Sequence, residues 1–450
     1  MNLRMLNTLR LKGSFKGGVH PAEVKELSKD VPFERLPDPK TVYIPVSQHA
    51  GREAKPLVAK GSTVKKGELL AESEGFISAP VHSPVSGMVT KISKTAHLSG
   101  APKTVIEISV AESTDTSFMP PLDPKTAARE ELLNRIKEAG IVGMGGAAFP
   151  MFVKLSPPPG KKIEKLIINA AECEPYLTRD YRLMLEYTDQ LIVGIEILMK
   201  ITGVECVIGI EDNKPEAVEV ITRKLGSRSD ISVKVLPVKY PQGAEKMLIY
   251  AVTGKKVPPG KLPVDVGVVM QNVGTAISVY KAVVEGQPQI EAWVSVTGGG
   301  ITSPRNLIVP IGTPVQNILE FCGGLKPEAV KVVAGGPMMG NNLYDYSAPV
   351  MKATSGLLAL TGAETTADGA VACLRCGKCV EVCPVNLMPT RISQFSKLQR
   401  FEDAEAAGIL VCMECGCCAY ECPANIPLVQ WIRLGKKEVI RLKQQERKTA

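Results

Sequence analysis

The sequence predicts a multidomain protein of mixed α/β and α+β class, and three observations carry this prediction. The chain has 450 residues, enough for about three or four domains of roughly 100–150 residues each. Between residues 166 and 285, apolar strand patterns alternate with amphipathic helix patterns, which is typical of a parallel α/β sheet. Near the C-terminus, two cysteine runs repeat one spacing, which predicts a separate metal-binding domain.

Composition and charge exclude several classes of protein. The contents of 44% hydrophobic and 22% charged residues are ordinary for a soluble, well-packed protein. No stretch reaches the roughly 18–20 uninterrupted apolar residues of a membrane span, and no apolar segment follows the basic N-terminal residues as in a secretory signal. The net charge of +8 is spread along the chain without the aromatic-interleaved basic motifs of nucleic-acid binding. We therefore expect a soluble protein on the cytoplasmic side that binds no nucleic acid.

Residues 1–122 are expected to form the first domain together with an N-terminal extension. Short β-runs at 42–45, 56–59, 69–72 and 89–92 are broken by Gly and Pro. The segments 64–70 and 78–89 resemble the biotinyl/lipoyl-like barrel-sandwich hybrid domain. In that family a Lys on a hairpin tip carries the cofactor, but no Lys occurs between Lys66 and Lys91. We therefore expect a scaffold or docking module here.

Residues 123–288 are expected to form the parallel α/β domain. The predicted strands are residues 166–169, 205–210, 233–237 and 266–271. The predicted helices are residues 127–137, 180–201, 215–225, 242–253 and 273–285. The first helix is marked by Asp123 as N-cap with Pro124 after it, and it stops at Gly140.

The remaining chain is expected to form three further parts. Residues 289–346 are predicted to be strands around one short helix at 315–321, and residues 347–366 a linker rich in Ser, Ala, Thr and Gly. Residues 367–430 form the cysteine-rich domain, and residues 431–450 a basic C-terminal helix.

The two cysteine runs carry the strongest chemical signal. Both Cys373–Pro384 and Cys412–Pro423 have the spacing C-x2-C-x2-C-x3-C-P, which holds cubane iron–sulfur clusters and sends the fourth Cys to the neighbouring cluster. On that pattern one [4Fe–4S] cluster is held by Cys373, Cys376, Cys379 and Cys422, and the other by Cys412, Cys415, Cys418 and Cys383. Zinc is the alternative, because paired C-x-x-C units also bind zinc. Two overlapping quartets that each end in Cys-Pro favour clusters, whose thiolates require a reducing compartment.

A glycine-rich loop at residues 143–150 is the second chemical signal. It does not follow a strand and open a helix, so it lacks the context of a Rossmann dinucleotide loop. It offers main-chain N–H groups without side-chain bulk, which suits a phosphate or a flat ring. Residues 169–175, which include Glu172 and Glu174, follow the next strand. They are therefore placed at the strand's carboxyl end, where α/β sheets bind ligands.

These motifs, in their order along the chain, resemble a known family. The loop, Lys154, Asn-Ala-x-Glu-x-Glu-Pro from Asn169, Tyr-x-x-Gly-x-Glu from Tyr240 and Asn-Val-x-Thr from Asn272 are similar to the flavin-bearing, NADH-oxidising subunit of respiratory complex I. The third unit resembles the β-grasp (SLBB-type) domain of that family. Two ferredoxin-like quartets together with a barrel-sandwich domain resemble, over essentially the whole chain, the C subunit of the Rnf complex, an ion-translocating ferredoxin:NAD+ oxidoreductase.

The resemblance implies binding roles for particular residues. The ring and ribityl chain of FMN would meet Gly143, Gly145, Gly146, Lys154 and Asn169. Glu172, Tyr240 and Gly243 would border the ring, with Asn272 and Thr275 near the phosphate. For NADH, Phe149 would stack on the base, and Glu174 and Glu245 would hydrogen-bond the nicotinamide or ribose.

The sequence departs from the family's pattern at Met144, Ala148, Pro157 and Ala171. Asn169 and Thr275 have an alternative interpretation as caps of turns or helices, and Glu172 and Glu174 as members of surface ion pairs.

The implied activity is an electron relay. NADH would deliver a hydride to FMN, and single electrons would pass through two [4Fe–4S] clusters to integral and ferredoxin-like partner subunits, or in reverse to NAD+. Hydride transfer needs no general acid or base, so we expect no catalytic side chain of that kind. The chain would be a peripheral subunit at the cytoplasmic face of the cell membrane. The alternatives are a ferredoxin-like adaptor without an active flavin site, and the flavin subunit of a soluble bifurcating oxidoreductase.

Overall fold

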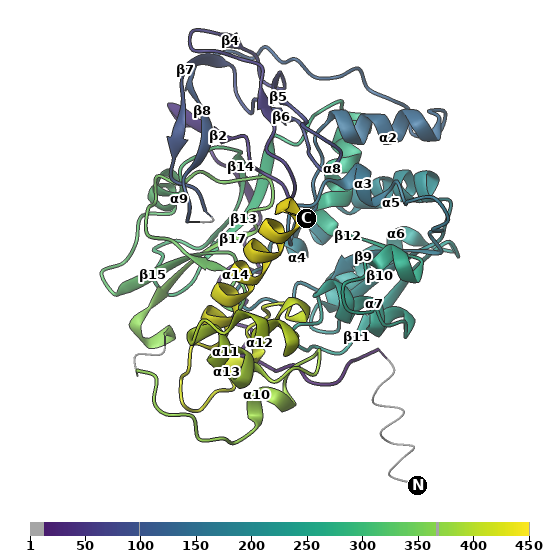
Figure 1. Cartoon of the computed structure of the whole chain (residues 1–450). Coiled ribbons are helices and arrows are strands. Elements are labelled where there is room, and N and C mark those ends of the chain that lie inside the picture. The colour runs from purple at the N-terminus through teal and green to yellow at the C-terminus, as the bar shows by residue number, and fades with distance from the viewer. Residues whose placement is uncertain (1–12, 99, 366–368, 450) are drawn as a thin grey trace.

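The computed structural model describes residues 13–98, 100–365 and 369–449. Figure 1 shows four units packed against one another, with the first unit at the top and the cysteine-rich unit at the bottom. In this view the C-terminal helix, coloured yellow, rises from the cysteine-rich unit.

The first unit is a sandwich of two small antiparallel sheets. One sheet has the order β2 (Thr41–Pro45), β8 (Lys103–Val110), β7 (Gly87–Thr95) and β4 (Thr63–Val64). The other has the order β3 (Lys55–Pro56), β5 (Leu69–Glu72) and β6 (Val81–His82). Alternate residues of the strands point inward, so that Ile44, Leu70, Val81 and Ile106 form a shared buried core.

The second unit is a four-stranded parallel sheet with helices on both faces. Its strands, in the order β11-β10-β9-β12, are β9 (Lys165–Ala170), β10 (Cys206–Glu211), β11 (Ile231–Leu236) and β12 (Val268–Asn272). Its helices are α2 (Arg129–Glu138), α3 (Met151–Lys154), α4 (Arg179–Glu186), α5 (Thr188–Thr202), α6 (Pro215–Leu225), α7 (Glu245–Thr253) and α8 (Val273–Val284), with a 3-10 turn at η1 (Pro263–Val266).

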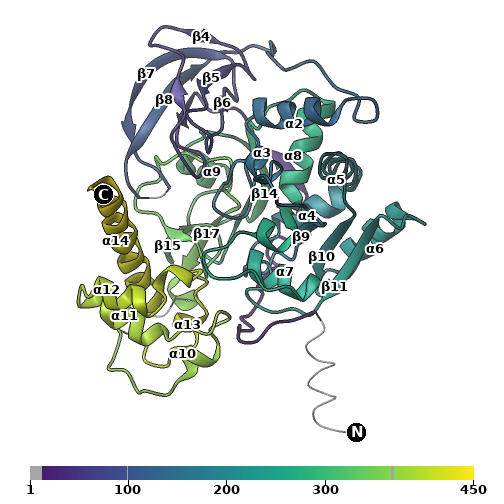
Figure 2. The ribbon, with the colours of Figure 1, turned by 45° about the vertical axis from the view of Figure 1, so that its right-hand side comes forward.

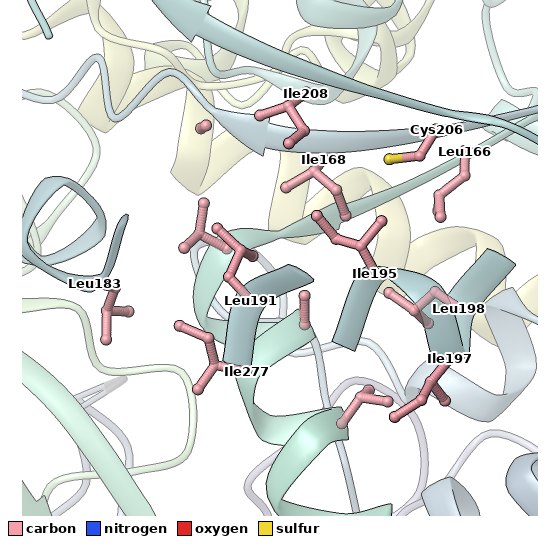
Figure 3. Packing of buried hydrophobic residues seen from close by; sticks show 14 of the residues in the cluster. Leu166, Ile168, Leu183, Leu191, Ile195, Ile197, Leu198, Cys206, Ile208 and Ile277 are labelled. Atoms are coloured by element: carbon pink, nitrogen blue, oxygen red, sulfur yellow. The ribbon is translucent and has the colours of Figure 1, made fainter. Parts of the chain in front are cut away.

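Burial of apolar side chains on both faces explains why these strands are continuous hydrophobic runs in the sequence. Figure 3 shows Ile168 and Ile208 of the sheet facing Leu191 and Ile195 of α5, with Ile277 of α8 completing the layer. A second cluster packs α7 against the opposite face of the sheet.

The predicted helix over residues 180–201 is wrong as one element, because the chain breaks at Tyr187 into α4 and α5. Thr188 donates its hydroxyl to the Met184 carbonyl at 2.5 Å, a local bond that competes with the helical ladder. Residues 242–244 of the predicted helix over 242–253 lie before α7. The other predicted strands and helices of this unit differ from the observed ones only at their ends.

The third unit is a six-stranded mixed sheet with one helix, α9 (Val315–Phe321). Its order is β1 (Phe33–Arg35), β14 (Arg305–Pro310), β13 (Glu291–Thr297), β17 (Gly356–Thr361), β15 (Ala329–Ala334) and β16 (Asn341–Asn342). Strand β17 lies within the segment 347–366, so the expected linker is wrong over these residues. Residues 357–360 are buried between β13 and β15 as an inner strand. A short 3-10 turn, η2 (Gly362–Glu364), follows.

The N-terminal extension does not belong to the first unit alone. Strand β1 pairs with β14 of the third unit. Before it, Val19 forms an antiparallel bridge with Tyr240, and the Gly18 amide donates to the Val382 carbonyl at 2.8 Å. Residues 13–31, purple in Figure 2, thus run along the α/β unit to the cysteine-rich unit. The N-terminal extension, which the sequence analysis groups with the first domain, therefore also contacts the second, third and cysteine-rich units.

The cysteine-rich unit repeats a short helix followed by a longer one. Its elements are α10 (Lys378–Glu381), α11 (Pro389–Lys397), α12 (Phe401–Ala406), η3 (Ile409–Val411), α13 (Cys417–Tyr420) and α14 (Leu428–Thr449). Helix α14 begins inside the predicted cluster domain rather than at residue 431, and it packs Ile432 and Val439 into this unit's core. Gly435 permits the close approach, since a Cβ there would lie 2.1 Å from the Ser396 hydroxyl on α11.

A buried lysine joins the first unit to the second. Lys352 is fully buried and donates to the Pro80 carbonyl at 2.8 Å and to the Gly140 carbonyl at 2.7 Å. Burial lowers the pKa of Lys352 to about 7. Lys352 therefore holds the first unit against the turn that follows α2, just before the glycine-rich loop.

We expect Lys352→Met to remove part of the pH dependence of stability. The folded chain releases the Lys352 proton near pH 7, whereas the unfolded chain holds it up to the ordinary pKa of 10.5. Between these values the unfolded state binds more protons, so the stability of the wild type rises with pH by up to ~1.4 kcal/mol per pH unit. Melting curves between about pH 7 and pH 9 should show this rise reduced in Lys352→Met but kept in the exposed control Lys331→Met. An equal rise in all three proteins would contradict the assignment.

Candidate functional site

The predicted binding residues meet where β9 and β12 end. Asn169 and Asn272 are direct partners in the ladder between these parallel strands, so both side chains lie at one carboxyl edge of the sheet. The glycine-rich loop lies against this edge, because the Met144 amide donates to the hydroxyl of Thr275 on α8 at 2.9 Å. The loop, the sheet edge and the first turn of α8 thus form one site.

The glycine-rich loop is fixed at its base and open at its tip. The Gly143 amide donates to the Phe149 carbonyl at 3.0 Å, which closes the loop. Gly145 and Gly146 are exposed, and Gly145 has φ +91°, a conformation that favours glycine. A Cβ at Gly146 would meet no described atom within 4 Å. The tip therefore presents bare main chain that a phosphate or a flat ring can approach closely.

Side chains from three further segments surround the loop. Lys154 on α3 forms an ion pair with Glu245 on α7 at 3.0 Å. Asn169 donates its amide to the Gly243 carbonyl at 2.8 Å. A Cβ at Gly243 would lie 3.2 Å from the Cys173 sulfur, so a side chain at this position would crowd Cys173. Residues separated by up to 91 positions in sequence are thereby brought together.

The two glutamates are half-buried and bonded to main-chain amides, and within the described ranges neither belongs to a surface ion pair. The Glu172 carboxylate accepts from the amides of Asp180 at 2.6 Å and Tyr181 at 3.0 Å, and so caps α4. Burial raises the pKa of Glu172. Glu174 accepts from the amides of Met338 and Met339 at 3.1 and 3.0 Å, and burial raises its pKa to about 7. Both carboxylates thus order the loops of the site.

Tyr240 connects the site to the cysteine-rich unit. The ring is buried, and its hydroxyl donates to the Cys415 carbonyl at 2.7 Å and lies 3.3 Å from the Glu174 carboxylate. Gly416 lies on the Met338 carbonyl, where a Cβ would be only 2.8 Å away. The second cysteine motif is therefore in direct contact with the loops that surround the candidate flavin site.

The cysteines gather in two groups that cross the sequence motifs. Cys383, from the first motif, lines one cavity with Cys412, Cys415 and Cys418 of the second. Among the other cysteines, those that act electrostatically on Cys379 are Cys376 and Cys422. In both motifs an amide donates to the first sulfur at 3.4 Å, from Arg375 to Cys373 and from Glu414 to Cys412. The exchange of the fourth ligand stays a prediction, and it would need Cys383 to lie beside the second motif, as it does here.

The two groups differ in exposure. Cys415 and Cys418 are buried, whereas Cys373 and Cys376 are exposed. Exposed apolar side chains of Val371 and Leu374 surround the latter pair. Over the described residues, no three His, Cys, Asp or Glu side chains are close enough together to hold a single metal ion. Cys417 is fully buried, with its sulfur 3.9 Å from the Tyr240 carbonyl.

Sequence reasoning missed two cations at the site, the half-buried Lys25 and the buried Arg179. Lys25, from the N-terminal segment, donates to the carbonyls of Glu172, Glu174 and Leu177 at 3.0, 3.0 and 2.6 Å. No local pattern marks it, because its partners lie about 150 residues away. Arg179, at the start of α4, pairs with Asp180 at 2.7 Å. An Arg-Asp pair directly after the predicted binding motif was the signal that could have identified it.

Comparison with known proteins accounts for each unit. Residues 13–113 match the RnfC barrel sandwich hybrid domain, and residues 136–281 match the Nuo51 FMN-binding domain. Residues 293–342 match the SLBB domain, and residues 372–426 match the 4Fe-4S dicluster domain. These matches confirm the predicted fold class, and they confirm the predicted types of cofactor domain.

Three curated relatives extend over most of the chain. The C subunit of a proton-translocating ferredoxin:NAD(+) oxidoreductase complex from Clostridium ljungdahlii is 45% identical, over 87% of this chain and 86% of that protein. Its counterpart in a Na(+)-translocating ferredoxin:NAD(+) oxidoreductase complex from Acetobacterium woodii is 43% identical, over 95% and 97%. The C subunit of an ion-translocating oxidoreductase complex from Rhodobacter capsulatus is 43% identical, over 94% and 82%. Along the described ranges, no helix is long and apolar enough to cross a membrane.

Proposed function

Because the chain belongs to the family of C subunits of ion-translocating ferredoxin:NAD(+) oxidoreductase complexes, the Rnf complexes, we propose that it is the subunit at which NADH exchanges electrons with such a complex. Electrons enter or leave at FMN in the α/β unit and pass through two [4Fe–4S] clusters. The observation that carries this order is the contact between Tyr240 and the Cys415 carbonyl, which joins the candidate flavin site to one cluster motif.

The residues at the sheet edge fit a flavin mononucleotide. The bare tip at Gly145 and Gly146 and the first turn of α8 supply amides for a phosphate. Lys154 lies at the opposite wall, where its ammonium favours negative charge on a reduced ring. Bound flavin supplies the chemistry of accepting two electrons as a hydride and passing them on one at a time. The protein positions the partners, and no side chain has to move a proton for the hydride step.

We propose modified roles for Glu245 and Glu174, because both already have partners within the protein. Glu245 forms an ion pair with Lys154. It can therefore orient the lysine until NADH binds and then hydrogen-bond the nucleotide. Glu174 holds Met338 and Met339 through both carboxylate oxygens, so its effect on the nicotinamide is exerted through the position of that loop. Tyr240 is turned towards Cys415 and links the ring's surroundings to the cluster motif.

The cluster held by Cys412, Cys415, Cys418 and Cys383 is proposed to be next to the flavin. The cluster held by Cys373, Cys376, Cys379 and Cys422 is proposed to face the partner subunits. Support for this order comes from the burial of Cys415 and the exposure of Cys373 and Cys376. The exposed Val371 and Leu374 beside the outer cluster offer an apolar contact surface that a partner would cover.

We place the chain as a peripheral subunit on the cytoplasmic face of the cell membrane, attached to integral and ferredoxin-like partner subunits. Helix α14 supports this placement only in part. Ile432 and Val439 of its apolar stripe are used inside the cysteine-rich unit, which leaves Leu434 and Ile440 exposed. Docking is therefore expected to use mainly the protein surface around the outer cluster.

We expect Phe149→Ala to separate nucleotide binding from flavin binding. Loss of one aromatic stacking contact costs about 1 kcal/mol, so the Michaelis constant for NADH should rise about fivefold while the FMN content stays unchanged. Steady-state NADH oxidation with an artificial acceptor and flavin release by acid measure the two effects. Tyr344→Ala, which removes an exposed aromatic ring from the third unit, should change neither quantity. An unchanged Michaelis constant in Phe149→Ala would place the nucleotide elsewhere.

A further inference from the structure

A buried arginine lies beneath the open tip of the glycine-rich loop. Arg179 opens α4 and is 2% exposed. Its Nε and Nη2 atoms lie 2.8 and 2.7 Å from one carboxylate oxygen of Asp180. Nη2 also lies 3.4 Å from the side-chain oxygen of Asn272, the N-cap of α8. The guanidinium is thus held rigidly between two helix starts.

One nitrogen of this guanidinium is left over. Nη1 is buried, and among the described residues it has no hydrogen-bond partner. A buried donor of a charged group without a partner is costly, so native proteins seldom leave one without a use. An arginine side chain has only hydrogen-bond donors, so the missing partner of Nη1 is an acceptor. Because the guanidinium is positively charged, an anionic oxygen fits best.

The tip of the glycine-rich loop lies against the same guanidinium, on its Nη2 side. A Cβ at Gly145 would lie 3.6 Å from Arg179 Nη2 and 3.4 Å from Asn272 Nδ2, so the loop rests directly on the guanidinium and the cap residue. Gly145, Gly146 and Ala147 are exposed above them. Main-chain amides, the N-terminus of the twelve-residue helix α8 and a buried cation therefore converge on one small region.

Arg179 also sets the charge of this region. The Asp180 carboxylate is bonded through both oxygens, since one pairs with Arg179 and the other accepts from the Asn272 amide at 2.6 Å. The Glu172 carboxylate caps the same helix through the amides of residues 180 and 181. Without Arg179, the negative charges of Asp180 and Glu172 would not be neutralised by an arginine. They would then repel an anion bound at the loop.

We propose that Arg179 is a positioning residue for the phosphate of FMN and makes the site select the phosphorylated flavin over riboflavin. This inference rests on the proposed flavin site and adds to it a residue outside the family's binding motifs. The guanidinium acts from below the loop: it neutralises Asp180, orients Asn272 and holds a spare donor for the anion. Its effect is expected at the phosphate end, because its own contacts are with Asp180 and Asn272, whereas Lys154 pairs with Glu245.

Titration of FMN and of riboflavin into flavin-free full-length chain, followed by quenching of flavin fluorescence, tests the proposal. Arg179→Gln should weaken FMN binding about tenfold to a hundredfold, the worth of a charge-assisted contact, and change riboflavin binding less than about threefold. Arg179→Lys keeps the positive charge but lacks the forked pair of guanidinium donors, so it should lose part of the preference for FMN over riboflavin. The control is Arg135→Gln, because Arg135 is a buried arginine on α2 that donates to the Ala282 carbonyl at 3.0 Å.

The outcomes separate three cases. A fall in the FMN-to-riboflavin ratio in the Arg179 variants, with an unchanged ratio in Arg135→Gln, supports the proposal. Equal losses of both flavins in the Arg179 variants would mean that the arginine is only structural, and would overturn it. If Arg179→Gln does not fold, Arg179→Lys decides, and an unchanged ratio in that variant counts against the proposal. A wild-type chain that binds neither flavin would instead refute the proposed function itself.

Discussion

Cys383→Ser is expected to destroy the cluster of the other sequence motif. Cys383 belongs to the first cysteine run but shares a cavity with Cys412, Cys415 and Cys418, so it is predicted to be the fourth ligand of their cluster. The variant should lose close to half of the bound iron, and the electron paramagnetic resonance signal of the cluster on the second run should disappear or be altered. The cluster on Cys373, Cys376 and Cys379 should keep its signal, because Cys422 completes it.

Cys417→Ser is the matched control. Cys417 is buried within the second run, beside Cys418, yet it has no place in the ligand pattern. Its replacement should leave the iron content unchanged. Damage in Cys383→Ser confined to the cluster on the first run would refute the exchange of ligands, and would leave each motif with its own four cysteines.

Gly145→Val is expected to abolish flavin retention. Gly145 has φ +91°, which a β-branched residue adopts only with strain. Its Cβ would already be in contact with Asn272 Nδ2 at 3.4 Å, so the two γ-methyl groups of Val would press on Asn272 and Arg179 and displace the loop from the surface that is proposed to receive the phosphate. Strain and displacement of about 2–3 kcal/mol correspond to a loss of affinity of roughly thirtyfold or more. Flavin content after purification and FMN affinity by fluorescence measure the effect.

Gly160→Val separates this effect from strain alone. Gly160 has φ +81°, and no described atom lies within 4 Å of its Cβ position, so the backbone cost is similar but the site is untouched. This control should lose stability and keep its flavin. Equal flavin contents in Gly145→Val and the wild type would remove the glycine-rich loop from the proposed site.

What the sequence predicted well depends on local spacing. The cysteines of the 4Fe-4S dicluster domain lie few residues apart, so their pattern is visible without the fold. The alternation of strands and helices between residues 166 and 285 likewise follows from neighbouring residues, because each strand is buried on both faces. Strand β17 was missed because its short apolar run, residues 357–360, lies within a longer stretch of small residues. It is a strand because it pairs with β13 and β15.

The contacts of the candidate site were not predictable in the same way. The motif order placed Asn169, Gly243 and Asn272 together, but it gave no sign that Glu172 caps α4 or that Glu174 holds Met338. Each of these bonds depends on where a distant loop lies. Lys25 is the clearest case, since three carbonyls converge on it from a loop that the chain reaches only after the whole first unit.

The central claim is that NADH electrons enter at the flavin and reach first the cluster completed by Cys383. The most direct test is anaerobic rapid mixing of NADH with the full chain after FMN and the clusters have been loaded. Wild type and Cys383→Ser are compared by absorbance and by freeze-quenched electron paramagnetic resonance. In the wild type, loss of flavin absorbance should precede reduction of both clusters. In Cys383→Ser the flavin should still bleach, while the remaining cluster should be reduced far more slowly. Flavin that stays oxidised, or an outer cluster reduced at the wild-type rate in Cys383→Ser, would contradict the claim.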